Sequence, residues 1–294
     1  MLKVDKKLNE KFLVFSADDF GLSEANNNAI KRAYNDGFLT STCVMANGHG
    51  FEHAVKEILP QCEGMGIGAH LNIFEGKALS KIAKTSKLCD GNGNFRHGFI
   101  SYLLNSCDKQ LLNEIEEEFR LQIESILEHT PIDHINTHVH IHAVPAVFEI
   151  TCALAKEYDI PFVRTQYEKF YTIPDFSKHT NFWYPINTAK IGILNTCTFV
   201  NNQNIYKYNL KTNNYQIGIG YTGYMDSKTI EYGLKAINKP CIAEIIVHPA
   251  IYDGNKNTYQ NARETEFRST IDKELFEKIT QMGWILTNFK KLSN

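Results

Sequence analysis

The chain has 294 residues with a formal net charge of −2 at pH 7, and 43% of its residues are hydrophobic and 22% charged. This composition is ordinary for a globular protein with a large core, and the lack of a basic stripe interleaved with aromatic residues argues against a nucleic-acid partner. No apolar run is long enough for a signal peptide or a membrane span, so we expect a cytoplasmic protein without a membrane partner.

The cysteines do not form a recognisable framework. There are seven, and no two are spaced as a Cys-x-x-Cys pair, at positions 43, 62, 89, 107, 152, 197 and 241. That pattern argues against a set of disulfides and against a zinc knuckle. We expect most of these cysteines to be reduced and to fill small spaces in the core.

The first third of the chain alternates strands with helices. Apolar, β-branched runs bounded by turn residues predict strands at 12–17, 40–46 and 66–73. Helices are expected from the Ser23 cap to Gly37, and over 51–59, where Pro60 ends the helix.

A long helix is predicted to begin at Asp108, which is a suitable N-cap. Apolar residues at helical spacing form one stripe along it, at positions 111, 115, 119, 123 and 126. The helix also carries a cluster of glutamates, at positions 114, 116, 117 and 118. We expect this acidic cluster mostly to face water.

The second half continues the alternation. Strands are predicted at 132–138, 161–165, 216–221, 241–247 and 284–286. Helices are predicted at 145–158, 227–238 and 263–282. Residues 75–107 and 166–215 interrupt the pattern, and we expect both to be long loops.

Repeated strand-helix units favour a parallel sheet with right-handed crossovers. Seven or eight of them predict an α/β fold, a single distorted TIM-like (β/α) barrel. No linker divides the chain, so we predict one domain over residues 1–294, with insertions at about 75–107 and 166–215. Loops after barrel strands build the substrate site, which makes these insertions the expected specificity elements. The alternative for 166–215 is a surface insertion without a role.

The stretch FSADDFGLS, residues 15–23, places Asp18 and Asp19 side by side at the end of the first predicted strand. Adjacent carboxylates repel each other, and charge beside a core is costly. We therefore expect a positive group close to these two side chains.

The stretch HINTHVHIH, residues 134–142, is the second unusual feature. On an extended strand, alternate side chains share a face, so His134, Asn136, His138 and His140 are expected to point the same way. Several imidazoles in register each need a hydrogen-bond partner or a metal, so the pattern favours a metal site over ordinary core histidines.

Two further strands end on a histidine, GIGAHLN with His70 and IIVHPA with His248. The carboxyl ends of barrel strands converge on one mouth, so these histidines, the aspartates and His138 are expected to meet there. The positive group beside the aspartates is then a divalent metal held by a carboxylate and two imidazoles.

The motifs FSADDFGLS, GIGAHLN, HINTHVHIHAVP and VHPA, which follow one another in this order along the chain, resemble those of the YdjC-like carbohydrate deacetylases. The resemblance runs from about residue 12 to residue 290 and is slight over 166–215. It implies a distorted (β/α) barrel and metal-dependent removal of an N-acetyl group from an amino sugar or chito-oligosaccharide. Position by position, it implies Asp19, His70 and His138 as metal ligands, Asp18 as the catalytic base and His248 as the general acid.

Two neighbours of this set are expected to assist it. We place His140 around the metal ligands or against the substrate, and Arg164 beside Asp18, which it would keep ionised. The alternative for Arg164 is a plain surface ion pair, because arginine is usually exposed.

The chain departs from the family pattern at Ser16, Asn136 and Thr137, where Asn, Asp and Ser are common. Asn136 can still hold a histidine by a hydrogen bond, but it cannot add negative charge near the metal. We expect a somewhat lower metal affinity from this change.

The sequence leaves the metal and the exact reaction open. Two imidazoles and a carboxylate suit zinc, cobalt or nickel on ligand softness, whereas the resemblance implies Mg²⁺ as often as Zn²⁺. Other hydrolysis of amides or phosphoesters on the same barrel is one alternative. A non-catalytic carbohydrate-binding relative is the other.

Aromatic side chains in the two insertions could stack on sugar rings or be ordinary packing, among them Phe95, Tyr167, Tyr171, Phe182 and Trp183. An exposed aromatic loop is also compatible with a homodimer.

Overall fold

The computed structural model describes residues 9–81, 83–178, 184–254 and 257–293. Its centre is one curled sheet in the order β5-β4-β3-β2-β1-β7-β6, with β8 pairing to β1, and every pairing is parallel. The strands are β1 (Lys11–Phe20), β2 (Ser41–Val44), β3 (Gly66–Leu71), β4 (His134–Thr137), β5 (Phe162–Val163), β6 (Tyr215–Ile217), β7 (Cys241–Val247) and β8 (Trp284–Thr287).

Strand β1 lies at the middle of the sheet. It pairs with β7 over Lys11–Ala17. Its first residues, Lys11–Val14, also pair with β8, and Ser16–Phe20 pair with β2. The last eight residues of β1 are buried, as is typical of a strand covered on both faces.

The two ends of the sheet approach each other. Strand β5 and the segment before β6 are joined where Val163 N–H donates to the Lys211 carbonyl (3.1 Å) and Lys211 N–H to the Pro161 carbonyl (2.8 Å). Gln216 N–H in β6 donates to the Tyr167 carbonyl (2.8 Å). The sheet therefore curls into a half-barrel with its edges bridged, which confirms the predicted α/β, distorted TIM-like fold.

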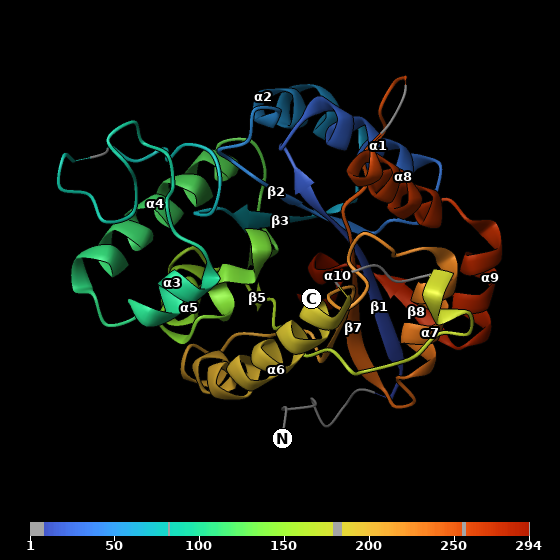
Figure 1. The fold of residues 1–294 in the computed structure, drawn as a ribbon. Coiled ribbons are helices and arrows are strands. Elements are labelled where there is room, and N and C mark those ends of the chain that lie inside the picture. Colours follow the sequence, from blue (N-terminus) through green and yellow to red (C-terminus); the bar gives the residue numbers. More distant parts are fainter. Residues whose placement is uncertain (1–8, 82, 179–183, 255–256, 294) are drawn as a thin grey trace.

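Helices flank the sheet on all sides (Figure 1). They are α1 (Glu24–Asn35), α2 (Phe51–His53), α3 (Phe99–Leu104), α4 (Lys109–Leu127), α5 (Pro145–Glu157), α6 (Tyr184–Lys207), α7 (Ser227–Lys235), α8 (Thr258–Thr270), α9 (Lys273–Gln281) and α10 (Phe289–Ser293). Other helical turns are the π-helical η1 (Ala54–Ile58) and the 3-10 segments η2 (Leu59–Gln61), η3 (His138–Ala143) and η4 (Phe176–Lys178). The predicted caps are confirmed, since the Ser23 side chain accepts from Asn26 N–H and Asp108 accepts from Gln110 and Leu111.

Several predicted elements are wrong. Pro60 does not end the helical segment that begins at Phe51, since it lies inside η2, and residues 75–107 contain α3 and are not a loop throughout. The expected helix 263–282 is two helices, because α8 ends at Thr270 and Asp272 caps a new one by accepting from Glu274 N–H and Leu275 N–H. Residues 166–215 are not an irregular loop, because they contain the 24-residue α6. Apolar residues lie on both the buried and the exposed sides of α6. The sequence therefore shows no single apolar stripe from which this helix could be predicted.

The acidic cluster on α4 is only partly solvated. Glu118 is fully buried and accepts from Leu79 N–H (3.0 Å) and Ser80 N–H (2.8 Å), and Glu114 accepts from Lys87 N–H and Leu88 N–H (both 2.9 Å). The expectation that these residues face water is wrong for Glu114 and Glu118, because their carboxylates anchor the 75–107 insertion to α4.

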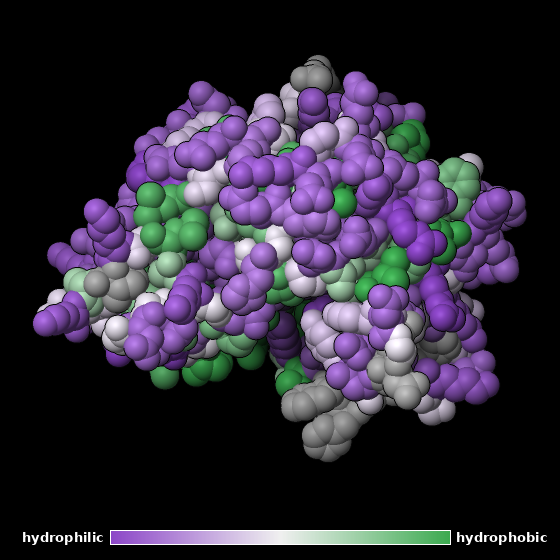
Figure 2. Space-filling model, turned by 90° about the horizontal axis from the view of Figure 1, so that it is seen from above, coloured by the Kyte–Doolittle hydropathy of each residue, from purple (hydrophilic) through white to green (hydrophobic). Residues whose placement is uncertain are grey.

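Within the described ranges, no helix is long and apolar enough to cross a membrane. The face seen from above is mostly hydrophilic, with hydrophobic side chains in small separate groups (Figure 2). The organisation of residues 1–294 as a single domain stays a prediction.

Candidate metal centre

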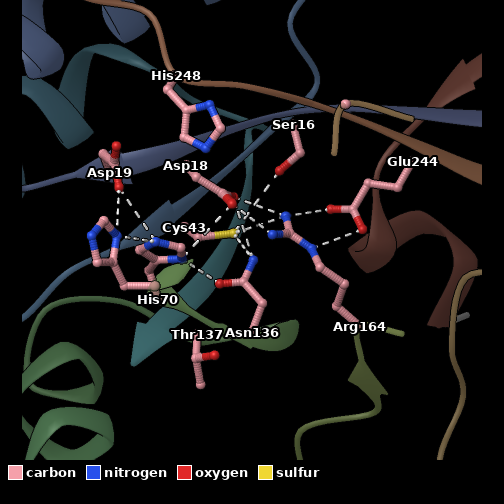
Figure 3. A network of polar contacts seen from close by, with 12 residues as sticks. Ser16, Asp18, Asp19, Cys43, His70, Asn136, Thr137, Arg164, Glu244 and His248 are labelled. Atoms are coloured by element: carbon pink, nitrogen blue, oxygen red, sulfur yellow. Dashed lines mark hydrogen bonds and ion pairs between the residues drawn. The ribbon is translucent and has the colours of Figure 1, made fainter. Parts of the chain in front are cut away.

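Asp18 and Asp19 lie near the carboxyl end of β1, and the backbone turns between their side chains. Asp19 has φ 69°, in the left-handed region that residues other than glycine adopt uncommonly, although aspartate tolerates it better than most. Gly21 follows with φ 98°, and a Cβ there would come within 2.8 Å of the Met45 carbonyl oxygen. This strained turn sends the two carboxylates to different neighbours, Asp18 toward Arg164 and Asp19 toward the histidines (Figure 3).

Asp19, His70 and His138 converge from three separate strand ends. Asp19 Oδ1 lies 3.1 Å from His138 Nδ1 and 3.4 Å from His70 Nε2, and the two imidazole nitrogens are 3.3 Å apart. In the part of the chain that the structure describes, no other three His, Cys, Asp or Glu side chains offer ligand atoms this close together. The predicted ligand set is therefore brought together, from β1, β3 and the turn after β4.

The cluster has the chemistry of a cation site. Ligands bound at about 2.1 Å in a tetrahedral site lie about 3.4 Å from one another, close to the separations found here. Asp19 Oδ2 is buried and has no hydrogen-bond partner. A carboxylate and two imidazoles facing one another across so short a span fit a divalent cation, which would satisfy their free lone pairs.

The remaining nitrogen of each imidazole faces an oxygen. His70 Nδ1 lies 2.5 Å from Asn136 Oδ1, and His138 Nε2 lies 3.3 Å from Glu75 Oε1. Donation of an N–H to these oxygens leaves the lone pairs of His70 Nε2 and His138 Nδ1 pointing into the cluster. Both contacts thus select the tautomer that a metal ligand needs.

Asp18 is held by a fully buried arginine. Arg164 Nη1 donates to Asp18 Oδ2 (2.6 Å) and Nη2 to Oδ1 (2.8 Å), while Nη2 and Nε donate to Glu244 (2.6 and 3.0 Å). Burial alone would raise the pKa of Asp18, but the charge and the hydrogen bonds of Arg164 hold this pKa well below its usual value. The alternative of a surface ion pair is wrong, because the Arg164 side chain has no exposed surface.

His248 follows β7, and its ring lies above Asp18 (Figure 3). Its backbone N–H donates to Glu266 Oε2 (2.6 Å), and its Nδ1 lies 3.2 Å from the same oxygen. Burial opposes the ionisation of Glu266, but hydrogen bonding and the charge of His248 lower its pKa. The imidazole is therefore fixed through Nδ1, which leaves Nε2 available for proton transfer.

The four polar side chains of the His134 strand do not share one face. Strand β4 ends at Thr137, and Val139 (φ 46°) and His140 (φ 60°) adopt left-handed backbone conformations. The expectation that His140 continues the strand face is wrong, because this turn separates it from His138. The buried Nδ1 of His140 has no hydrogen-bond partner, and burial holds the pKa of this imidazole well below its usual value.

His134 lies deeper in the barrel. Its Nδ1 is 2.5 Å from Asp133 Oδ1 and its Nε2 is 3.0 Å from Cys43 Sγ. Asn136 connects the neighbours of His134 with those of Asp18, since its Nδ2 donates to Cys43 Sγ (2.8 Å) and lies 3.4 Å from Asp18 Oδ1.

Several residues at the site escaped the sequence analysis. Glu266 and Arg263 stand three apart on α8, and Arg263 Nη2 lies 3.7 Å from Asp19 Oδ2. The i, i+3 spacing of two oppositely charged residues was the available signal for this pair, and it is a weak one. Glu244, inside the apolar run of β7, was a second signal, because a charge there needs a partner.

Comparison with known proteins gives one consistent family. A family model described as YdjC-like protein matches residues 12–281. Carbohydrate deacetylases of Clostridium beijerinckii and Thermoanaerobacter pseudethanolicus are 28% and 27% identical, over 95% and 96% of this chain and 99% of each relative. A crystal structure of a candidate cellobiose-phosphate cleavage protein from Enterococcus faecalis superposes with a TM-score of 0.74 at 23% identity, covering 96% of this chain and 99% of that one. The similarity to this crystal structure shows that the two chains share a fold.

Proposed function

This chain belongs to the YdjC-like protein family, and from that premise we propose that it is a metal-dependent hydrolase that removes an N-acetyl group from an amino sugar or chito-oligosaccharide. The observation that carries the proposal is the convergence of Asp19, His70 and His138 beside Asp18. The names of the full-length relatives support carbohydrate deacetylation.

Asp19, His70 and His138 would hold the cation, with Zn²⁺ and Mg²⁺ as the two candidates. The two imidazoles favour Zn²⁺ on ligand softness. A bound divalent cation in such a site polarises the acetamide carbonyl and lowers the pKa of a water molecule.

Asp18 is the proposed base. It is ionised near neutral pH, because Arg164 balances its charge, and it can take the proton of the attacking water. The water oxygen forms a bond to the carbonyl carbon, and the bond from that carbon to nitrogen then breaks. Acetate and the free amine are the products.

His248 is the proposed acid. The departing nitrogen needs a proton, and Nε2 of His248 can supply it while Glu266 holds Nδ1. We propose that Asn136 and Arg164 position His70 and Asp18, and that His140 lies beside the substrate or behind the ligands.

The test is acetate release from N-acetylglucosamine oligomers by purified protein, with and without a chelator. We expect release that the chelator abolishes, that added Zn²⁺ or Mg²⁺ restores, and that Asp18→Asn eliminates. Absence of release from a broad panel of acetylated glycans contradicts the proposal.

The two alternatives make different predictions. Phosphoester or other amide hydrolysis on this barrel commonly uses two or more metals, so the number of cations per chain discriminates it. A non-catalytic sugar-binding protein would show no turnover, and Asp18→Asn would bind sugar as the parent does.

A homodimer is a further proposal about assembly. It is supported by exposed apolar side chains on α6, where Phe199 is 75% and Ile186 is 52% exposed. Light scattering after size-exclusion chromatography tests it, with a mass near 67 kDa for a dimer of the 33.6 kDa chain (2 × 33.6).

A further inference from the structure

Phe74 is a partly exposed aromatic residue at the edge of the metal centre. It lies three residues after the end of β3, and 39% of its surface is exposed. Its ring centroid is 6.1 Å from that of His138, with the ring planes at 50°. A Cβ added at Gly98 would lie 3.8 Å from the Phe74 ring, so glycine leaves that edge without a covering side chain.

The loop that carries Phe74 is held rigidly. Asn72 Oδ1 accepts from Phe74 N–H (2.9 Å) and Glu75 N–H (3.2 Å), and Asn72 Nδ2 donates to the Glu75 carbonyl (2.7 Å). The backbone of Asn72 is itself bonded in both directions to the side chain of Gln122 (2.8 and 2.7 Å). A single exposed aromatic side chain needs no explanation by itself, but the backbone that carries this one is fixed in place beside the metal centre.

The loop is also tied to the metal centre directly. The Glu75 carboxylate lies 3.3 Å from His138 Nε2, so the residue next to Phe74 contacts a proposed metal ligand. The backbone that carries Phe74 is therefore tied to His138 through the neighbouring residue.

We propose that the Phe74 ring is the surface on which the pyranose ring of the substrate stacks. This inference rests on the proposed deacetylation. The acetamide carbonyl must reach the cation that Asp19, His70 and His138 would hold, and the amide nitrogen is bonded directly to the sugar ring. The pyranose is thus held within a few ångströms of this cluster, where its polarised C–H groups can face the electron-rich ring of Phe74.

The aromatic residues singled out from the sequence fit this role less well. Phe95 is buried, and Tyr167 and Tyr171 pack against the core. Phe182 and Trp183 lie outside the described residues.

The test compares Phe74→Ala and Phe74→Tyr with a matched control, Phe276→Ala. Phe276 is 43% exposed on α9 and packs on Phe38, so its removal takes away a similar aromatic side chain elsewhere. For N-acetylglucosamine oligomers, we expect Phe74→Ala to raise KM roughly three- to tenfold, with kcat within about twofold of the parent. Phe74→Tyr and Phe276→Ala should keep the parent KM, and Zn²⁺ affinity should be unchanged in all three.

If the parent releases acetate and Phe74→Ala has the same KM as the parent, the proposal that Phe74 stacks on the sugar is wrong. The proposed reaction is not affected by that result. A fall in Zn²⁺ affinity in Phe74→Ala that matches the change in KM also overturns it, because Phe74 would then act by supporting His138. A parent without turnover overturns the proposed reaction itself.

Discussion

Arg164 donates one hydrogen bond to each oxygen of Asp18, and the same guanidinium donates two to Glu244. One cation thus balances two fully buried carboxylates in the interior of the barrel. Charges in such a place are tolerated only when they are paired and hydrogen-bonded.

Replacement of Arg164 by Met should therefore be strongly destabilising. Two buried carboxylates would lose the guanidinium that donates to both of them, and we expect the free energy of unfolding to fall by about 3–5 kcal/mol in urea denaturation. Arg120→Met is the control, since Arg120 forms partly exposed pairs with Glu116 and Glu157, and it should cost less than about 1 kcal/mol. Equal losses in the two variants contradict the charge-balance role of Arg164.

Asn136 should tune the affinity for the cation. Its Oδ1 holds His70 Nδ1, so Asn136→Ala should weaken Zn²⁺ binding about 10- to 100-fold. Asn136→Asp should instead tighten it, because a carboxylate at this position makes the imidazole a stronger ligand. Competition with a chromogenic chelator measures both, and an Asn136→Asp variant that binds Zn²⁺ more weakly than the parent contradicts the argument.

Glu168 should make stability depend on pH. Its buried carboxylate accepts from the backbone N–H groups of Gly218 (3.1 Å), Ile219 (2.7 Å) and Gly220 (3.2 Å), yet burial raises its pKa to about 7. The folded state therefore binds this proton more tightly than the unfolded state, whose pKa is near 4.3. The stabilisation is complete below about pH 4 and is lost as pH rises toward about 7.

The measurement is the free energy of unfolding of the parent and Glu168→Gln at pH 5 and pH 8. Relative to the variant, which cannot ionise, the parent should lose up to about 3 kcal/mol between these two values. Parallel pH dependence of the two proteins would show that Glu168 ionises normally in the folded state.

The ends of the strands were the most predictable part of the molecule. Buried apolar runs ending in Asp18, His70 or His248 place polar groups where parallel strands converge, and the structure brings these residues to one region (Figure 3). His138 was located correctly for a partly wrong reason. Alternation placed it on a strand face, whereas the strand ends at Thr137 and a strained turn follows.

The residues that support the site were less predictable, because their partners are far away in the sequence. Glu244 and Arg164 meet across 80 residues, and Asn136 meets Asp18 across 118. Nor could pattern analysis find α6, whose apolar residues lie on all sides. The spacing of apolar residues predicts a helix when that helix has one buried face. It does not predict a helix such as α6, whose apolar residues are not confined to one face.

The proposed activity requires that Asp19, His70 and His138 together hold one cation. Calorimetric titration of the metal-free protein with Zn²⁺ tests this requirement directly. We predict one tight site per chain, weakened at least about a hundredfold in His70→Asn and in Asp19→Asn, together with loss of acetate release. A parent that binds no Zn²⁺ or Mg²⁺, or variants that bind as tightly as the parent, would contradict it.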